Sequence, residues 1–166
     1  MWQALAFLRK NVSRIFSPEP ENPGDDLREV ECGPAIKLMG IFPSAADRKL
    51  LHELSARHSW TVVFASSCDE AREMLVRVQP QIVLLDREAE AADWRYSMSS
   101  LAVQSNGACV LLVSRVIDEY LWNAVVSNGG YDVVRKPLGE EDLLRNVRLA
   151  WSYWNVTRRI NAGATK

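Results

Sequence analysis

The 166-residue sequence has few cysteines and no long apolar run, and both shortages argue against whole classes of protein. Its three cysteines, at positions 32, 68 and 109, are widely spaced and form no CxxC pair. This argues against a disulfide framework and a cysteine zinc site, and favours a reducing compartment. The longest apolar run, 108–113, has about six residues, whereas a membrane-spanning helix needs roughly 20. We therefore expect a cytoplasmic protein.

An excess of one charge is also missing. Lys and Arg total 20 and Asp and Glu total 21, which gives a formal net charge of −1. On bulk charge this argues against a strongly basic nucleic-acid-binding protein. Glycine is scarce as well, with 8 residues, and neither GxGxxG nor GxxxxGK[ST] occurs. The sequence therefore lacks the glycine-rich loops that hold nucleotide phosphates.

Two N-terminal segments differ in composition from the rest. Residues 1–16 carry three basic residues and no acid, and their spacing predicts an amphipathic helix whose apolar face holds Trp2, Leu5, Leu8, Val12, Ile15 and Phe16. Such a helix would dock on its own domain or on a second copy in a homodimer, lie on a membrane surface, or bind a partner; a disordered tail is a further alternative. Residues 17–34 carry six acids, one Arg and four prolines, which indicates a solvated linker.

The body of the chain, residues 35–157, alternates short apolar runs with amphipathic stretches, followed by a C-terminal tail at 158–166. Strands are predicted over 36–42, 61–65, 81–86, 109–114 and 131–136. Capping boxes at Ser44–Asp47 and Ser67–Glu70 open the first two helices, and further helices are predicted over 92–104, 117–128 and 140–159. Strands that alternate with helices predict an α/β fold: a doubly wound five-stranded parallel sheet with helices on both faces.

Polar side chains end three of these strands. Asp86 ends the third strand, Ser114 the fourth, and Lys136 follows the fifth. Because sites in such sheets form beyond the carboxyl ends of the strands, we expect these three residues to converge. An Asp there can act as a nucleophile toward phosphorus, while a Lys and a Ser hold phosphoryl oxygens.

On these residues, the chain from about 36 to 154 resembles the receiver (CheY-like) domain of bacterial response regulators. The runs QIVLLD, CVLLVS and VVRKPL carry the resemblance, which covers about 120 of the 166 residues. It implies a flavodoxin-like (βα)5 fold. It also implies that Asp86 is the position that accepts phosphate from a histidine kinase, that Ser114 senses the phosphate, and that Lys136 pairs with it.

The sequence departs from that family at the metal site. The acidic pair that binds Mg²⁺ in the family aligns with Phe42 and Pro43, which offer no side-chain ligand, and the nearest acid, Asp47, is explained by helix capping. We therefore expect Mg²⁺ binding to be weak or absent, with no other cofactor, and phosphorylation of Asp86 to be poor or absent. Arg115 stands beside the site and would occupy the anion pocket.

The resulting hypothesis is an atypical stand-alone receiver in two-component (phosphorelay) signalling. It would act by contact with a histidine kinase or a downstream signalling protein, without enzymatic output beyond a self-catalysed phosphotransfer to Asp86. No helix-turn-helix pattern follows, which argues against nucleic acid as a partner. Two alternatives stay open: a functional phosphoacceptor phosphorylated on Asp86, and an unrelated flavodoxin-like protein that binds a nucleotide or a flavin.

Several residues are candidates for contact with that partner. In the family, the surface formed by the last two helices and the last strand commonly binds partners or a second copy. Its counterpart here holds Trp122, Trp151, Trp154 and Arg158, and Trp and Arg are frequent at interface hot spots. The alternative is that Trp151 and Trp154 belong to the core. We interpret His52 and His58 as surface residues and the cysteines as buried apolar residues.

Overall fold

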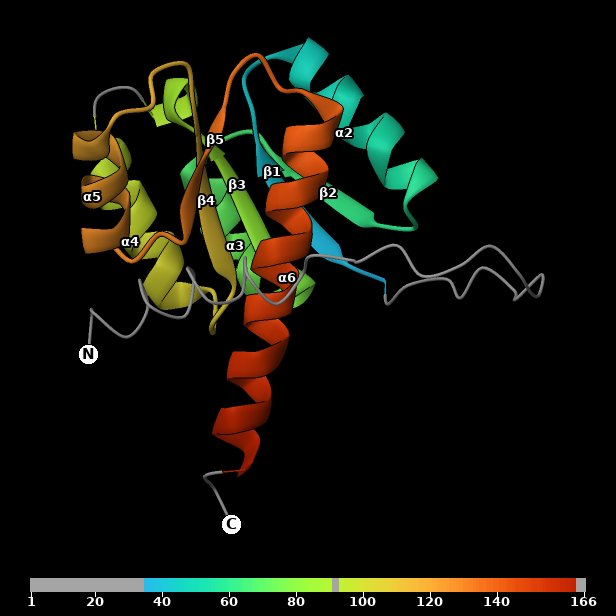
Figure 1. Ribbon diagram of the computed structural model, residues 1–166, viewed down its shortest axis with the longest axis vertical. Coiled ribbons are helices and arrows are strands. Elements are labelled where there is room, and N and C mark those ends of the chain that lie inside the picture. The colour runs from blue at the N-terminus through green and yellow to red at the C-terminus, as the bar shows by residue number, and fades with distance from the viewer. Residues whose placement is uncertain (1–34, 91–92, 164–166) are drawn as a thin grey trace, which may run out of the picture. The chain divides into compact units, whose positions relative to one another are not determined.

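The computed structural model describes residues 35–90 and 93–163, which form one α/β unit (Figure 1). Its strands are β1 (Lys37–Ile41), β2 (Thr61–Ala65), β3 (Ile82–Asp86), β4 (Cys109–Ser114) and β5 (Asp132–Arg135). Its helices are α2 (Ala45–Arg57), α3 (Cys68–Val78), α4 (Trp94–Gln104), α5 (Glu119–Ser127) and α6 (Glu140–Gly163), with a 3-10 turn η1 (Arg87–Glu90) after β3. The predicted helix at 1–16 and linker at 17–34 lie outside the described residues.

The strands form a single parallel sheet in the order β2-β1-β3-β4-β5, which is the flavodoxin-like order. Two apolar clusters cover its faces. One cluster joins the sheet to α2 and α6 through residues such as Leu51 and Val147. The other joins it to α3, α4 and α5 through residues such as Leu75 and Met98. The predicted doubly wound (βα)5 fold is therefore confirmed for the described part of the chain.

The helices begin where the sequence provides side-chain caps. Ser44 Oγ accepts the backbone N–H of Asp47 at 3.3 Å, and Ser67 Oγ accepts that of Glu70 at 3.2 Å, so the serine half of each predicted capping box is confirmed. The acidic half is not, because the Glu70 carboxylate accepts from the N–H of Ser66 and the Asp47 carboxylate pairs with Lys136. Asp93 and Asp118 cap α4 and α5 in the same way. Each cap fixes the residue at which the chain turns from the end of a strand into a helix, and so positions the loops at the carboxyl edge of the sheet.

Helix α6 is longer than the sequence predicted. It runs to Gly163, past the predicted end at residue 159, and includes most of the segment that we expected to be a tail. Figure 1 shows it crossing one face of the sheet and continuing past the sheet's end. No helix in the described residues is both long enough and apolar enough to cross a bilayer.

The central strands explain why the sequence contains short continuous apolar runs. Every residue of β3 and β4 is buried, because both faces of the sheet are covered by helices. Cys68 and Cys109 are buried free thiols, as predicted, and Cys32 lies outside the described residues. Burial raises the pKa of the Cys68 thiol to about 11 and that of Cys109 to about 12, so both thiols are protonated at neutral pH.

Candidate functional site

The three strands that carry the predicted site residues are neighbours in the sheet. Asp86 is the last residue of β3, Ser114 the last of β4, and Lys136 follows β5 directly. The parallel register places Asp86 opposite Val113 and Ser114 opposite Arg135, so all three strands end at one edge. The backbone N–H of Lys136 donates to the carbonyl of Ser114 at 2.9 Å. The sheet topology thus brings the predicted residues to one place.

The ammonium group of Lys136 is the centre of this site. It donates a hydrogen bond to Asp86 Oδ2, lies 2.8 Å from Asp47 Oδ2, and lies 3.6 Å from Glu88 Oε2. Asp86 is fully buried, and only 5% of the Lys136 side chain is exposed. Burial by itself lowers the pKa of Lys136, but the bonds to Asp47 and Asp86 outweigh it, so that this pKa lies above its usual range. Lys136 is therefore charged and held by two carboxylates.

The second carboxylate, Asp47, is the residue that sequence reasoning missed. Its backbone N–H fills the capping role that the sequence predicted, by donating to Ser44 Oγ. Its side chain has a different role, because the carboxylate forms an ion pair with the Lys136 ammonium group. The interpretation of Asp47 as a capping residue alone was therefore wrong. The available signal was its place in the first turn of the helix after β1, which puts it at the same edge as Asp86.

Ser114 is buried beside these residues, but its hydroxyl bonds locally. The Oγ–H donates to the carbonyl of Val116 at 2.9 Å, and the Oγ accepts the N–H of the same residue at 3.3 Å. These bonds hold the turn that leaves β4. The proposed role of Ser114 in sensing phosphate stays a prediction.

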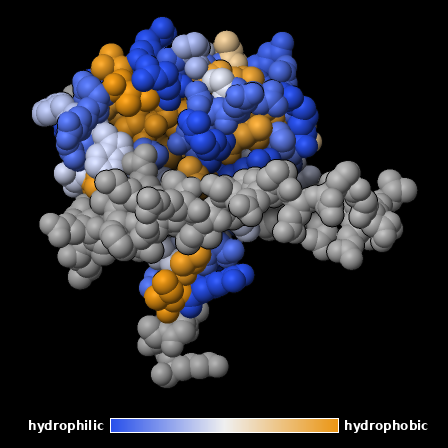
Figure 2. Space-filling view, in the orientation of Figure 1, coloured by the Kyte–Doolittle hydropathy of each residue, from blue (hydrophilic) through white to orange (hydrophobic). Residues whose placement is uncertain are grey.

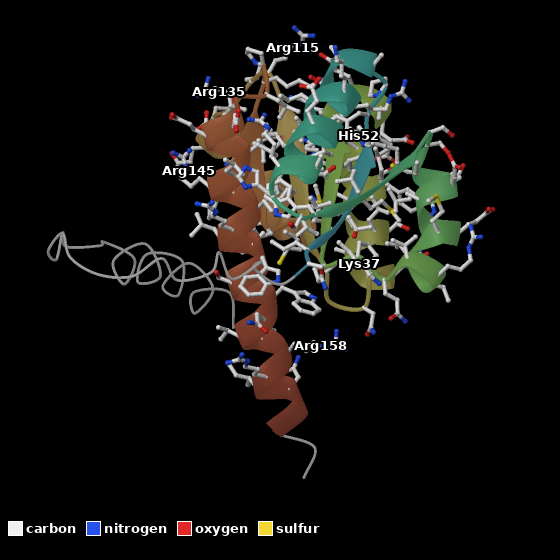
Figure 3. All side chains as sticks on the ribbon, turned by 90° about the vertical axis from the view of Figure 1, so that its right-hand side faces the viewer. Lys37, His52, Arg115, Arg135, Arg145 and Arg158 are labelled. Atoms are coloured by element: carbon white, nitrogen blue, oxygen red, sulfur yellow. The ribbon has the colours of Figure 1, made fainter. Side chains whose placement is uncertain are left out.

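Glu88 and Arg115 lie at the partly exposed side of the site. The backbone N–H of Glu88 donates to Asp86 Oδ1 at 2.9 Å, and its carboxylate accepts from Arg115 Nε at 2.6 Å. The hydrogen bond from Arg115 lowers the pKa of Glu88. We expected Arg115 to occupy the anion pocket, but the structure pairs it with Glu88 and leaves 72% of its side chain exposed. Figure 3 shows Arg115 at the end of the molecule opposite the projecting end of α6.

Comparison with known proteins relates this arrangement to solved structures only, because no protein-family model and no curated protein matches the chain. The BeF3-activated receiver domain of Klebsiella pneumoniae RstA is 23% identical, with a TM-score of 0.62 over 69% of this chain and 97% of that one. A response regulator from Thermotoga maritima is 20% identical, with a TM-score of 0.65 over 71% and 98%. NtrX from Brucella abortus, solved in complex with ADP, is 16% identical, with a TM-score of 0.68 over 77% of this chain.

The chain has the receiver-domain fold. It spans nearly all of the RstA and Thermotoga maritima chains but only 29% of the NtrX chain, so the likeness to NtrX concerns one part of that protein. At these identities the comparisons establish the fold, whereas activity must be argued from this chain's own residues.

The end of β1, where the sequence predicted no metal ligands, carries no side-chain oxygen. Phe42 is packed into the core with 2% exposure, and Pro43 is exposed; neither has a side-chain oxygen. The carboxylates of Asp47 and Asp86 converge instead on an ammonium group. In the described part of the chain, no group of acidic, histidine or cysteine side chains is arranged to hold a metal ion. The donor set therefore suits the Lys136 cation.

The candidate interface residues divide between the two faces of the receiver fold. Trp151 and Trp154 are half-buried against the cluster under α2 and α6, and Arg158 lies 5.0 Å from the Trp154 ring. Trp122 packs against the opposite cluster, and its Nε1–H donates to Asp132 Oδ1 at 3.2 Å. Each Trp thus has a structural role in its own helix, and a role in binding a partner stays a prediction.

Proposed function

We propose that this chain is an atypical receiver of two-component (phosphorelay) signalling that acts by contact with a protein partner rather than by a phosphate switch. The observation that carries the proposal is the state of Lys136, whose ammonium group is shared between the fully buried carboxylate of Asp86 and the partly buried carboxylate of Asp47. The pairing supplies internally the positive charge that a metal ion supplies in phosphoryl transfer. The receiver-like domain then keeps one conformation without a bound metal ion or phosphoryl group.

The charges around Asp86 support this reading. Asp47, Asp86 and Glu88 contribute −3, and Lys136 and Arg115 contribute +2, so the cluster sums to −1. An acyl phosphate on Asp86 would replace one carboxylate charge by about two phosphate charges. The cluster of these five residues would then carry about −2. Mg²⁺ would be needed to offset this charge, and we infer that it binds weakly or not at all.

The surroundings of Asp86 support the same conclusion. The Glu88 carboxylate, which pairs with Arg115, lies 3.6 Å from the Lys136 ammonium group and adds negative charge beside Asp86. Both oxygens of Asp86 are already engaged, one by Lys136 and the other by the N–H of Glu88. Each bond draws electron density from the carboxylate and so weakens Asp86 as a nucleophile toward phosphorus. We therefore infer no enzymatic role for the chain, and expect transfer to Asp86 to be slow or absent.

The test is to incubate the full chain with acetyl phosphate and Mg²⁺ and to measure intact mass, with Asp86→Asn as the matched control. The expected result is the same unmodified mass for both proteins. A second measurement follows tryptophan fluorescence during titration with beryllofluoride and Mg²⁺, using the RstA receiver as the positive control. A gain of one phosphate that is absent in Asp86→Asn would overturn the proposal and favour a functional phosphoacceptor.

A nucleotide- or flavin-binding function has less support. The ADP in the NtrX structure belongs to a protein of which this chain spans 29%. The turn after β1 here is Phe42-Pro43-Ser44, which has no glycine for close approach of a phosphate. An absorbance spectrum of the purified protein that shows a bound flavin or nucleotide would restore this alternative.

A further inference from the structure

The end of α6 projects beyond the sheet and is strongly basic (Figure 1). In the described residues, contact between α6 and the apolar core ends at Trp154, and residues 155–161 continue the helix for about 10 Å. From position 143 onward the sequence contains no acidic residue and five basic ones: Arg145, Arg148, Arg158, Arg159 and Lys166. A helix end of this composition favours an anionic partner.

The same end exposes large apolar side chains. Val156 is 54% exposed and Ile160 is 65% exposed, and they lie on one side of the helix because they are four residues apart. Leu149 and Tyr153, both half-buried, continue this stripe toward the body of the molecule. Figure 2 shows an apolar patch beside hydrophilic surface on the projecting end. Any partner must therefore accept apolar and cationic groups together.

The arginines of this end are available for such a partner. Arg148, Arg158 and Arg159 are exposed, and no ion pair joins them to another residue in the described part of the chain. Arg145 differs, because it pairs with Asp142 at 2.7 Å. Arg158 also covers one face of the Trp154 ring, which places an aromatic ring next to the cationic groups.

A second copy of the chain does not match this surface. Pairing two α6 helices through Val156 and Ile160 would bring Arg159 of one copy close to the arginines of the other copy. Stable helix pairs place opposite charges beside their apolar seam, and this helix offers no acid after Asp142. Nucleic acid matches the charge but not the apolar side chains, since its outer surface is made of phosphates.

We propose that the projecting end of α6, residues 154–161, binds the surface of an anionic phospholipid bilayer. Val156 and Ile160 enter the boundary between headgroups and acyl chains, and Arg159, which flanks them on the helix surface, contacts the phosphate-bearing headgroups. Arg158 lies on the other side of the helix and adds its charge to the long-range attraction by the anionic surface. Arg115, which pairs with Glu88 beside Asp86, and Arg158 lie at opposite ends of the molecule (Figure 3), so the Asp86 site stays open to a protein partner.

The experiment is co-sedimentation of the full chain with phosphatidylcholine vesicles and with vesicles that also contain phosphatidylserine. Binding is expected only to the anionic vesicles and should weaken as salt is added. Arg158→Gln/Arg159→Gln should lower partitioning by about fivefold for each arginine. Val156→Ser/Ile160→Ser should lower it as well, because apolar burial is lost.

Matched controls come from the opposite face of the sheet. Arg77→Gln/Arg95→Gln makes the same charge change on α3 and α4, and Val76→Ser/Val103→Ser removes side chains that are 78% and 80% exposed. Both controls should bind like the wild type. Because all the changed positions are exposed, circular dichroism should show an intact fold in every variant.

Three outcomes would overturn the proposal. The first is that wild-type protein does not sediment with anionic vesicles. The second is that binding survives the α6 changes and is lost only in Arg9→Gln/Lys10→Gln/Arg14→Gln, which would assign it to residues 1–16. The third is that the α6 changes leave vesicle binding intact but abolish binding to duplex DNA or dissociate a dimer in sedimentation velocity.

Discussion

Replacing Asp86 by Asn should destabilise the fold, and the sign of this effect tests the proposed site. In a pocket governed by repulsion between carboxylates, neutralising one of them would stabilise the protein. Here the fully buried Asp86 accepts from the Lys136 ammonium and from the N–H of Glu88. Asn can still accept from Glu88, but the charged bond to Lys136 is lost, which costs about 1.5–3 kcal/mol.

Removing Lys136 should cost more. Lys136→Met leaves Asp86 buried with a single backbone N–H donor, and leaves Asp47 with a side chain only 18% exposed. Breaking a buried ion pair from one side typically costs about 3–5 kcal/mol, because the remaining charge has no partner. That is a large part of the roughly 5–15 kcal/mol that stabilises a domain.

The double variant Asp86→Asn/Lys136→Met completes the cycle. It removes both buried charges together, so its loss should be smaller than the sum of the two single losses by about 0.5–3 kcal/mol. The assay is urea unfolding at neutral pH, followed by tryptophan fluorescence and by circular dichroism. Equal denaturant slopes across the four proteins would show that only stability has changed. An increase in the free energy of unfolding in Asp86→Asn, or strictly additive losses, would refute the shared-lysine interpretation.

Three further predictions follow from the same structure. Because the pKa of Lys136 is raised on folding, its stabilisation is present below its unfolded pKa and is lost as the pH rises through the folded one. The difference in unfolding free energy between wild type and Lys136→Met should thus be constant up to about pH 10 and fall above it, and a fall below about pH 9 would contradict this. In a Cys32→Ser background, Cys68 and Cys109 should react slowly with a disulfide reagent at about pH 8 and readily in urea, because burial raises the pKa of Cys68 to about 11 and of Cys109 to about 12; rapid labelling of the native protein would contradict their burial. Gly130→Ala should cost about 1–3 kcal/mol in thermal or urea unfolding, since its Cβ would lie 2.5 Å from Val125 Cγ1, whereas Gly139→Ala meets open space and serves as the control.

Most of the fold could be predicted from the sequence, because the apolar runs and helix caps indicate the same strands and helices that a parallel sheet requires. The predicted strand 109–114 and the capped helix starts at Ser44 and Ser67 match the structure. Short apolar runs separated by capped helices leave few arrangements other than a parallel sheet covered on both faces. The end of α6 was harder to predict, because no glycine or proline near residue 159 marks where the helix stops. Its last turns also do not pack on the core, so no regular spacing of buried apolar residues indicates that the helix continues.

The site could be predicted only as far as the backbone determines it. Asp86, Ser114 and Lys136 stand at the ends of adjacent strands, so topology alone brings them together. Asp47 and Glu88 were missed because their part depends on side-chain direction. Asp47 has both a capping N–H and a carboxylate that points to Lys136, and the pattern of residue types identifies only the first.

The acidic run after β3 shows how side-chain direction, which the sequence does not reveal, bears on function. In the sequence, Arg87 to Glu90 is a charged run directly after the predicted strand 81–86. In the structure it is the turn η1, whose residues reach different elements. Arg87 lies 5.8 Å from the Trp94 ring of α4, Glu88 pairs with Arg115 beyond β4, and Glu90 accepts the N–H of Cys68 in α3 at 3.4 Å. Each of these contacts is weak by itself, since an exposed ion pair such as Glu88–Arg115 contributes little to stability. Together they connect η1 to three elements, which agrees with the proposal that this side of the domain keeps one conformation.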